Sequence, residues 1–445
     1  MNVLKQYFFL ISIFCFFSIS AQKGFFFEKP SRSYVKVPFK LIGNLMVLDV
    51  KLNDIPLSFI LDTGANHTFL FNLADADSLE LKNTKRIKVN GLGSSESVAS
   101  IKSSNNKFQI GGLVNNNQSI HLILDKEINF SSQLGVSIHG IIGCDLIENF
   151  ITKINYSAHT LKFYKPENYK YDKLSKYEPL NVFLHQQRMY INANVSIETD
   201  DLLLVTLLLD TGSSDSVWLF TDKNRTINVP KKKFRDYMGT GIGGNIHGDR
   251  SRLKKIQIAN YELSEAKVAF PDSIDIALAY KNMNRQGSLG AGILKRFNMV
   301  FDYGGKKMYL KKNRFFKKPF EYNMSGIQIE HNGLRVEKVY NGKIKFSEAA
   351  SQTSNARNAY SINSLFKTSL VPVFEIVEVR EGSPAALSGI QVGDILLYVN
   401  KKPTYKYQIS EIVEMLSEKE GKELTLEVER KGEKMKFEFK LKRML

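Results

Sequence analysis

The sequence predicts a mainly β protein, in which two similar β lobes are followed by a smaller α+β domain. Residues 59–65 read FILDTGA and residues 207–213 read LLLDTGS, and the segments after them also repeat. In both, an apolar run leads directly into Asp-Thr-Gly, which is the pattern of a buried strand that delivers one carboxylate to a site at its end. After residue 319 the pattern changes, and short strand-like and helix-like segments alternate.

The two halves keep the same spacing over a long distance. Gly143 ends a Gly-Ile-Ile-Gly run 81 residues after Asp62 (143 − 62), and Gly290 ends a Gly-Ser-Leu-Gly run 80 residues after Asp210 (290 − 210). A single Asp-Thr-Gly is weak evidence for a site, because Asp and Gly are common in ordinary turns. Two copies in register indicate one structural unit that is used twice.

The doubled motif resembles the retropepsin and pepsin class of aspartic proteases, over about residues 34–313. The resemblance implies two retropepsin-like β-barrel lobes related by pseudo-twofold symmetry, at residues 34–165 and 175–313. It also implies that Asp62 and Asp210 act jointly as general base and general acid in peptide hydrolysis, because two adjacent carboxyl groups cannot both ionise. Both half-sites are on one chain, so we expect a monomer. A homodimer with lobes paired between chains is the alternative assembly.

The residues after each aspartate form the supporting turn of the expected site. By resemblance, the two threonines hydrogen-bond across the lobe interface and the two glycines allow a tight turn. A hydroxyl follows the second glycine only, and a hydrogen bond from it would favour ionisation of Asp210. The supporting residues are Thr63, Gly64, Ala65, Thr211, Gly212 and Ser213.

Between aspartate and glycine run, each half contains a glycine-rich stretch flanked by strand-like sequence. We name residues 89–95 flap 1 and residues 239–244 flap 2. Glycines at a hairpin tip permit unusual backbone angles and close approach to a ligand. By resemblance these flaps close over an extended polypeptide substrate; the alternative is a pair of hairpin loops without substrate contact. The flap candidates are Gly91, Leu92, Gly93, Gly241, Ile242 and Gly243.

The N-terminal residues 1–21 have the features of a secretory signal peptide: one early lysine, an apolar run at residues 7–19 and a small residue, Ala21, at the boundary. An uncleaved anchor is the alternative. We therefore expect an exported protein of the periplasm, cell envelope or medium, which meets the membrane only during export. Without this segment Cys144 is the single cysteine, so no intrachain disulfide can form, and we expect it to be a small buried hydrophobe.

Residues 320–441 resemble a bacterial PDZ domain, joined to the protease region by residues 314–319. The motif GSPAALSG at residues 382–389 predicts a helix with a proline in its first turn. An amphipathic helix is predicted around Ile409–Leu416, followed by strands at 423–430 and 434–441. PDZ domains bind peptides by adding a strand beside such a helix. A polar insertion predicted at residues 342–370 leaves a purely structural role as the alternative.

Other function classes find little support in the composition. The formal net charge of +17 is spread over lysine-rich loops and accompanies no nucleic-acid-binding motif, so we expect no nucleic-acid partner. The seven histidines show no metal-ligand spacing and no Ser-His-Asp arrangement, so we expect His67 to be a surface residue and the protein to need neither metal nor cofactor. The expected partners are polypeptide substrates and a peptide ligand of the PDZ domain. A non-catalytic peptide-binding envelope protein is the alternative function.

Overall fold

The computed structural model describes residues 24–71, 79–93, 96–125, 128–221, 227–277, 285–340 and 366–445. The predicted export signal lies outside these ranges. A search of the described residues for a helix with the length and apolar character needed to span a membrane found none.

The described strands of lobe 1 form a nine-stranded mixed sheet. Strand β5 (Ile55–Leu61) ends directly before Asp62 and pairs in parallel with β10 (Gly140–Ile142), with Gly140 opposite Phe59. The repeated glycine run therefore lies beside the strand that carries the first aspartate. The other strands of this sheet are β1 (Phe26–Phe27), β3 (Lys40–Ile42), β4 (Leu45–Leu52), β6 (Thr68–Leu70), β7 (Lys85–Val89), β8 (Val98–Ile110) and β9 (Leu113–Ile123).

Lobe 2 repeats this arrangement in a ten-stranded sheet. Strand β16 (Leu203–Asp210) pairs in parallel with β23 (Gly287–Gly290), with Gly287 opposite Leu207. The equivalent strands thus pair in the equivalent register, as the spacing of the two halves predicted. The other strands are β14 (Phe183–His185), β15 (Arg188–Ser196), β17 (Val217–Leu219), β18 (Phe234–Gly241), β19 (Gly244–Arg252), β20 (Lys255–Ile258), β21 (Tyr261–Ser264) and β22 (Lys267–Pro271).

A six-stranded sheet joins the two lobes through the antiparallel pair β11 (Ile151–Asn155) and β24 (Phe297–Asp302). These strands occupy equivalent places in the two halves, and one apolar core runs through both lobes. The lobes are therefore packed together within a single chain. The remaining strands of this sheet are β2 (Tyr34–Pro38), β12 (Thr160–Tyr164), β13 (Glu178–Asn181) and β25 (Lys307–Lys312).

The helices in the lobes are short. The sequence suggested helical pieces at residues 145–150 and 292–297, whereas the structure has a 3-10 turn at η1 (Cys144–Leu146) and one turn of helix at α4 (Ala291–Leu294). Each stops early because the chain must enter the next strand, β11 or β24. The other helical elements here are α2 (Phe130–Leu134), η2 (Pro166–Asn168) and η3 (Tyr171–Leu174).

The C-terminal domain has an antiparallel sheet and a core of its own. Helix α6 (Ile409–Leu416) lies where its pattern predicted. The insertion expected at residues 342–370 was predicted to end too late, because residues 366–370 belong to β27 and pair with β26. Residues 341–365 lie outside the described residues. The elements are β26 (Ile327–Tyr340), β27 (Phe366–Val379), α5 (Pro384–Ser388), β28 (Ile395–Val399), β29 (Lys402–Pro403), η5 (Thr404–Lys406), β30 (Glu423–Arg430) and β31 (Glu433–Lys440).

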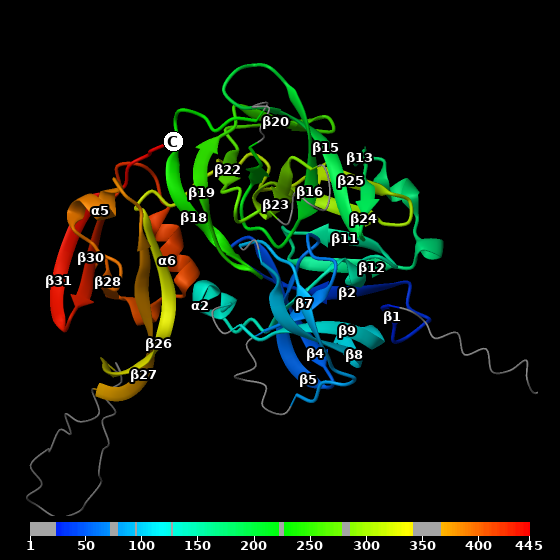
Figure 1. The fold of residues 1–445 in the computed structure, drawn as a ribbon, viewed down its shortest axis with the longest axis horizontal. Helices are drawn as coiled ribbons and strands as arrows, with labels where there is room; N and C mark the ends of the chain where they lie inside the picture. Colours follow the sequence, from blue (N-terminus) through cyan, green and yellow to red (C-terminus); the bar gives the residue numbers. More distant parts are fainter. Residues whose placement is uncertain are drawn as a thin grey trace, which may run out of the picture.

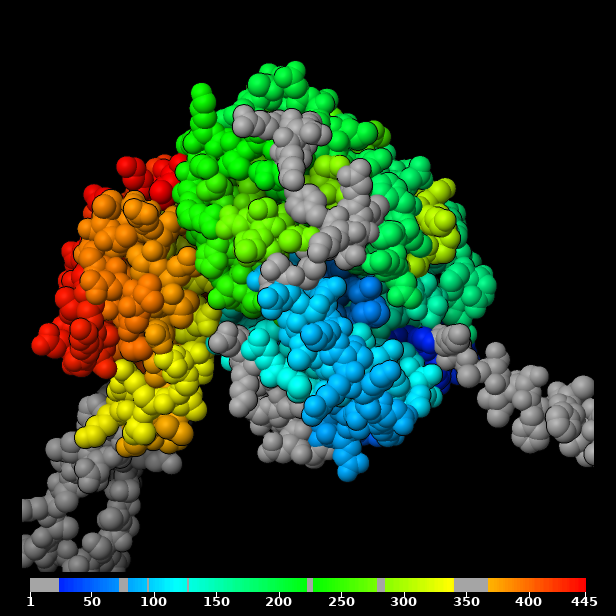
Figure 2. All heavy atoms as spheres, in the orientation of Figure 1, coloured from blue at the N-terminus to red at the C-terminus, as the bar shows by residue number. Residues whose placement is uncertain are grey.

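The C-terminal domain packs against the side of lobe 2, beside β18, with α2 of lobe 1 close to α6 (Figures 1 and 2). Phe234, the first residue of β18, belongs to the apolar core of the C-terminal domain, and its ring centroid lies 5.5 Å from that of Tyr322. The guanidinium of Arg380 stacks 3.9 Å from the Phe234 ring centroid. The strand that leads to flap 2 is therefore anchored in the C-terminal domain.

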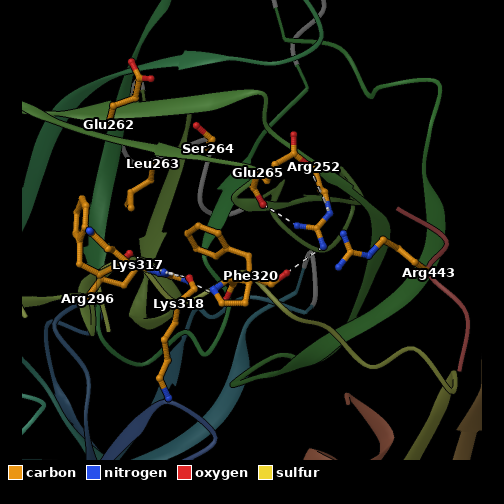
Figure 3. Close-up of a pocket in the computed structure, with 12 residues that line it drawn as sticks. Arg252, Glu262, Leu263, Ser264, Glu265, Arg296, Lys317, Lys318, Phe320 and Arg443 are labelled. Carbon is orange, nitrogen blue, oxygen red and sulfur yellow. Dashed lines mark hydrogen bonds and ion pairs between the residues drawn. The ribbon is translucent and has the colours of Figure 1, made fainter. Parts of the chain in front are cut away.

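The connecting segment at residues 314–319 is held by one buried arginine. Arg296 donates hydrogen bonds to the carbonyl oxygens of Phe315, Phe316, Lys318 and Pro319, and its guanidinium lies 3.5 Å from the ring centroid of Phe320. The same segment borders a cavity of about 430 Å³ (Figure 3), which Arg252 and Arg443 also line. Neither predicted catalytic aspartate lines this cavity, so we assign it no part in the candidate site.

Candidate active site

Asp62 and Asp210 lie at the ends of equivalent strands and face each other across the lobe interface. Their carboxyl groups are in hydrogen-bond contact with one another. A Cβ atom added at Gly64 would lie 2.9 Å from Cγ of Asp210, and one added at Gly212 would overlap the Asp62 carboxylate. Only glycine leaves room for the opposite acid at each position. One chain therefore brings the two aspartates together without a second copy.

Each active turn holds its own carboxylate by backbone hydrogen bonds. The Gly64 N–H donates to Oδ1 of Asp62 at 2.7 Å, and the Gly212 N–H donates to Oδ1 of Asp210 at 3.0 Å. Ser213 adds a second backbone bond to Asp210, at 2.9 Å, and its donor is the backbone N–H, not the hydroxyl. The expected contact from the Ser213 hydroxyl is thus replaced by one that any residue can make. Both aspartates remain partly exposed.

Thr63 and Thr211 interlock the two turns. The Thr63 hydroxyl donates to the Leu209 carbonyl at 2.7 Å and accepts from the Thr211 N–H at 3.1 Å. The Thr211 hydroxyl donates to the Leu61 carbonyl at 2.8 Å and accepts from the Thr63 N–H at 3.0 Å. Both side chains are fully buried. These four bonds fix the separation of the strand ends that carry the acids.

The two carboxyl groups differ in their electrostatic surroundings. Burial, together with the charge of Asp210, raises the pKa of Asp62 to about 8. Burial also raises the pKa of Asp210, but the guanidinium of Arg285 and the N–H of Ser213 oppose that shift. The pair titrates as a unit, and the contacts that oppose the shift at Asp210 favour Asp62 as the site of the shared proton. One group can then donate a proton while the other accepts one.

Flap 1 and flap 2 contact each other directly. The Gly243 N–H donates to the Leu92 carbonyl at 2.8 Å, the Gly93 N–H donates to the Asp275 carbonyl at 2.9 Å, and a Cβ added at Gly91 would lie 2.7 Å from Cβ of Ile242. A Cβ at Gly241 would overlap the Leu92 carbonyl. Leu92 of lobe 1 packs on the apolar cluster of lobe 2, which contains Trp218, whereas Ile242 of lobe 2 packs on a lobe 1 cluster.

Several charged residues that the sequence analysis did not single out surround the lobe 2 turn. Asp215, five residues after Asp210, accepts from the Trp218 indole at 2.8 Å and pairs with Arg250 at 2.6 Å. Arg250 also pairs with Asp236 on the flap 2 strand at 2.5 Å. Arg285 is buried, and its Nη1 has no hydrogen-bond partner among the described residues. Arg285 lies two residues before β23 (287 − 285), and a charged residue at that place was the available signal for it.

Helix α2 links lobe 1 to flap 2. Gln133 donates from Nε2 to the Tyr237 hydroxyl at 2.9 Å and to Oγ1 of Thr240 at 3.0 Å. Its neighbour Ser132 donates to Glu330 of the C-terminal domain at 2.8 Å. The flap 2 strand is therefore held from both lobe 1 and the C-terminal domain.

Cys144 and His67 take no visible part in the site chemistry. Cys144 is fully buried, as predicted, and its Sγ contacts the Thr63 carbonyl at 3.0 Å. His67 is exposed, as predicted, and its ring lies 4.6 Å from that of His121. Among the described residues, no group of three or more His, Cys, Asp or Glu side chains is arranged to hold a metal ion.

Comparison with known families agrees with this geometry. Residues 48–146 and 194–294 each match the family model described as aspartyl protease, and residues 375–430 match that of the PDZ domain. A comparison with curated proteins found no match. The two aspartyl protease matches contain Asp62 and Asp210, and the third lies within the C-terminal domain. The chain thus carries two aspartyl protease regions, one per lobe, followed by a C-terminal PDZ domain.

Proposed function

We propose that the protein is an exported aspartic endopeptidase that hydrolyses peptide bonds at the Asp62/Asp210 pair. The observation that carries the proposal is the pair itself, two carboxyl groups in contact across the lobe interface, in surroundings that raise the pKa of Asp62 and partly oppose that shift at Asp210. The match of a region in each lobe to the aspartyl protease family model supports the same chemistry. Export rests on the pattern of residues 1–21.

The arrangement accounts for hydrolysis by water. The ionised carboxylate takes a proton from a water molecule as its oxygen attacks the peptide carbonyl carbon, and the protonated carboxyl group gives its proton to the carbonyl oxygen. In the next step the carboxyl group that took the proton from water gives it to the amide nitrogen, the other carboxylate takes a proton from a hydroxyl of the tetrahedral intermediate, and the C–N bond breaks, which releases an amine and a carboxylic acid. Thr63 and Thr211 serve as positioning residues, because they fix the strand ends.

The proposed substrate is a polypeptide in extended form. It would lie between the aspartates and the two flaps, recognised through its backbone, with alternate side chains in pockets. The crossed packing of Leu92 and Ile242 on opposite lobes supports such closure. The PDZ domain would select or position substrates, since its class binds peptides.

A peptidase assay on an unfolded protein such as casein, from acidic to neutral pH, tests the proposal. We expect Asp62→Asn and Asp210→Asn each to lose about 100-fold or more of the activity, the usual share of general acid–base catalysis. The exposed Asp49→Asn, which breaks only a surface ion pair with Lys40, is the matched control and should keep full activity. Inhibition by a pepstatin-type compound would add support. Equal activity of all four proteins would refute the proposal and favour a non-catalytic peptide-binding role.

A further inference from the structure

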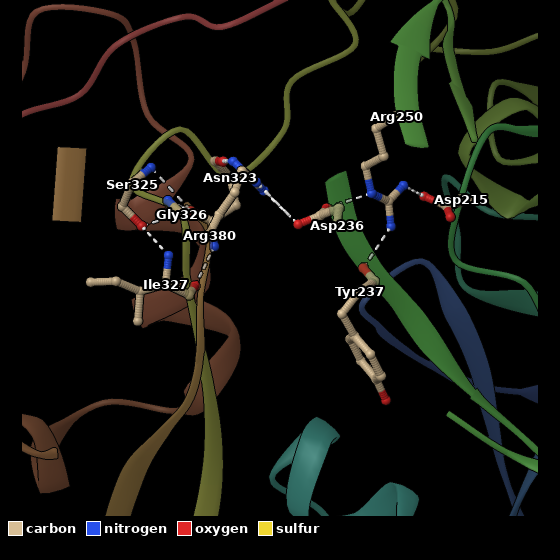
Figure 4. A network of polar contacts seen from close by, with 9 residues as sticks. All are labelled: Asp215, Asp236, Tyr237, Arg250, Asn323, Ser325, Gly326, Ile327 and Arg380. Atoms are coloured by element: carbon tan, nitrogen blue, oxygen red, sulfur yellow. Dashed lines mark hydrogen bonds and ion pairs between the residues drawn. The ribbon is translucent and has the colours of Figure 1, made fainter. Parts of the chain in front are cut away.

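The two strands that carry flap 2, β18 and β19, contribute charged side chains that reach both the lobe 2 turn and the PDZ domain. Arg250 of β19 pairs with Asp215 of the turn at 2.6 Å and with Asp236 of β18 at 2.5 Å. Asp236 also pairs with Arg380 of the PDZ domain at 2.9 Å. The four side chains are at most 18% exposed. One continuous series of ion pairs therefore runs from the turn after Asp210 to the PDZ domain (Figure 4).

Both ends of this series are fixed by further hydrogen bonds. Asp215 accepts from the Trp218 indole at 2.8 Å, and its backbone carbonyl accepts from the Gly292 N–H at 2.8 Å. At the other end, Arg380 donates from Nη1 to the Asn323 carbonyl within the PDZ domain, at 3.0 Å. The strands that carry flap 2 lie between these two ends, so they are held from both sides.

The contacts with the PDZ domain stop where the backbone of β18 changes. Phe234 and Asp236 contact the PDZ domain, and the pairing of β18 with β19 then shifts register between Tyr237 and Gly239. Gly239 has a φ of 125°, a conformation that favours glycine. Such a bulge bends a strand and changes its direction. The contacts before the bulge therefore fix the point from which flap 2 extends toward lobe 1.

Flap 1 takes its position from flap 2. The carbonyl of Leu92 in flap 1 accepts from the Gly243 N–H of flap 2 at 2.8 Å. Among the ion pairs between described residues, none involves β7, the strand that leads to flap 1, and the one on β8 is at Lys107, near the far end of that strand. The ion pairs that hold flap 2 have no equivalent beside flap 1, so a displacement of flap 2 would also displace flap 1.

We infer that Arg380 of the PDZ domain is a positioning residue of the peptidase, which acts through Asp236 and Arg250 to hold flap 2 in place relative to the lobe 2 turn. Displacement of the flap strands would separate these ion pairs and leave charges unpaired away from water, which is strongly unfavourable. The PDZ domain is then a structural part of the peptidase site. The inference rests on the proposed function, because it takes the flaps to bind a polypeptide substrate.

Hydrogen exchange of the full chain tests the link without any need for activity. We expect Arg380→Gln to accelerate exchange at residues 234–244 about 10-fold or more, because the buried partner Asp236 loses its ion pair with the PDZ domain. Arg335→Gln is the matched control, since Arg335 pairs with Glu337 and Glu429 inside the PDZ domain, and it should leave exchange at residues 234–244 unchanged.

A second variant covers the case in which Arg380→Gln unfolds the PDZ domain, which exchange in β28 and β30 would reveal. Asp236→Asn breaks the same link from the lobe side and should accelerate exchange at residues 234–244 while β28 and β30 stay protected. Unchanged exchange at residues 234–244 in both variants would overturn the inference, whether or not the protein hydrolyses peptides.

Initial rates on fluorescein-labelled casein measure the effect on the reaction. We expect Arg380→Gln and Asp236→Asn each to raise KM about 10-fold with little change in kcat, because flap contacts to the substrate are lost while the aspartates stay in place. The double variant should lose no more than the larger single variant, since both act on one link. The pH limbs of kcat/KM should not move.

The opposite results are equally clear. Losses that multiply in the double variant, or a fall in kcat with displaced pH limbs, would show that Arg380 does not act through Asp236 on the flap, and the inference would fail. A parent protein that hydrolyses nothing would refute the proposed function instead, and the exchange measurement alone would then decide whether the PDZ domain holds flap 2.

Discussion

At the residue scale, the proton on Asp62 links catalysis to stability. Its pKa is about 8 in the folded protein, against about 3.9 for an aspartate in an unfolded chain. Between these values the folded state binds more protons than the unfolded state, so the free energy of unfolding decreases as the pH rises. Below pH 4 and above pH 8 this contribution no longer changes. The site therefore costs stability at neutral and alkaline pH.

Asp62→Asn should remove this pH dependence. The free energy of unfolding of the parent should fall between pH 5 and pH 9, because the buried carboxyl group of Asp62 must lose its proton over that range. The asparagine does not ionise, so we expect the stability of the variant relative to the parent to be about 1 to 4 kcal/mol greater at pH 9 than at pH 5. Urea denaturation of both proteins at the two pH values measures the difference. Asp49→Asn is the control for loss of a surface carboxylate. An identical pH dependence in the parent and Asp62→Asn would show that Asp62 ionises normally.

The two aspartates could be predicted from sequence because the motif repeats in register. The influence of Arg285 on Asp210 could not, because it depends on how β16 and β23 pair, not on any local pattern. The same holds for Arg250, whose partners Asp215 and Asp236 lie 35 and 14 residues away. Charge pairs between strands leave no periodic trace in a single sequence.

At the element scale, the interlocked threonines show how two strand ends depend on each other. Removal of the Thr63 hydroxyl leaves the Thr211 N–H and the Leu209 carbonyl buried without their partner. Each such orphaned group costs about 1–3 kcal/mol. We expect Thr63→Val to lower the free energy of unfolding by about 2–5 kcal/mol and to reduce peptidase activity, since the acids lose their fixed separation.

Thr152→Val is a matched control for that substitution. Thr152 is also fully buried, in β11 of the sheet that joins the lobes, but its hydroxyl has no hydrogen-bond partner among the described residues. The same change should therefore be neutral or stabilising there. Urea denaturation of the two variants measures the difference. If both lose equal stability, the cost comes from the shape change and not from the hydrogen bonds.

The strands around each aspartate and helix α6 followed from apolar patterns in the sequence. Helix α2 did not, because its five residues are too few for a periodic pattern. In the structure the Asn129 side chain accepts a hydrogen bond from the Ser131 N–H at its start, and Gly135 adopts a φ of 67° at its end. The contact between the two flaps could not be predicted from the sequence, because it joins residues about 150 positions apart, although the glycines that permit it were predicted as flap residues.

At the scale of the whole molecule, the PDZ domain is fixed to the protease by contacts between residues far apart in the chain. Arg380 and Asp236 are separated by 144 residues, and Phe234 belongs to the PDZ core. The joint between the domains was predicted at residues 314–319, but no pattern in the sequence indicated that this segment is held by a buried side chain. That property comes from Arg296, whose side chain binds four carbonyl groups of the joint.

Arg296→Met should release the joint. Methionine fills similar apolar space but donates no hydrogen bonds, so the carbonyl groups lose their common partner, at a cost of about 3 kcal/mol or more. We expect faster hydrogen exchange at residues 314–320 and a larger radius of gyration in solution scattering, since the PDZ domain can then move away from lobe 2.

Arg314→Met, which replaces an exposed arginine on the same segment, is the control and should change neither quantity. An unchanged radius and exchange rate would mean that the contacts of Arg380 and Phe234 alone hold the PDZ domain in place.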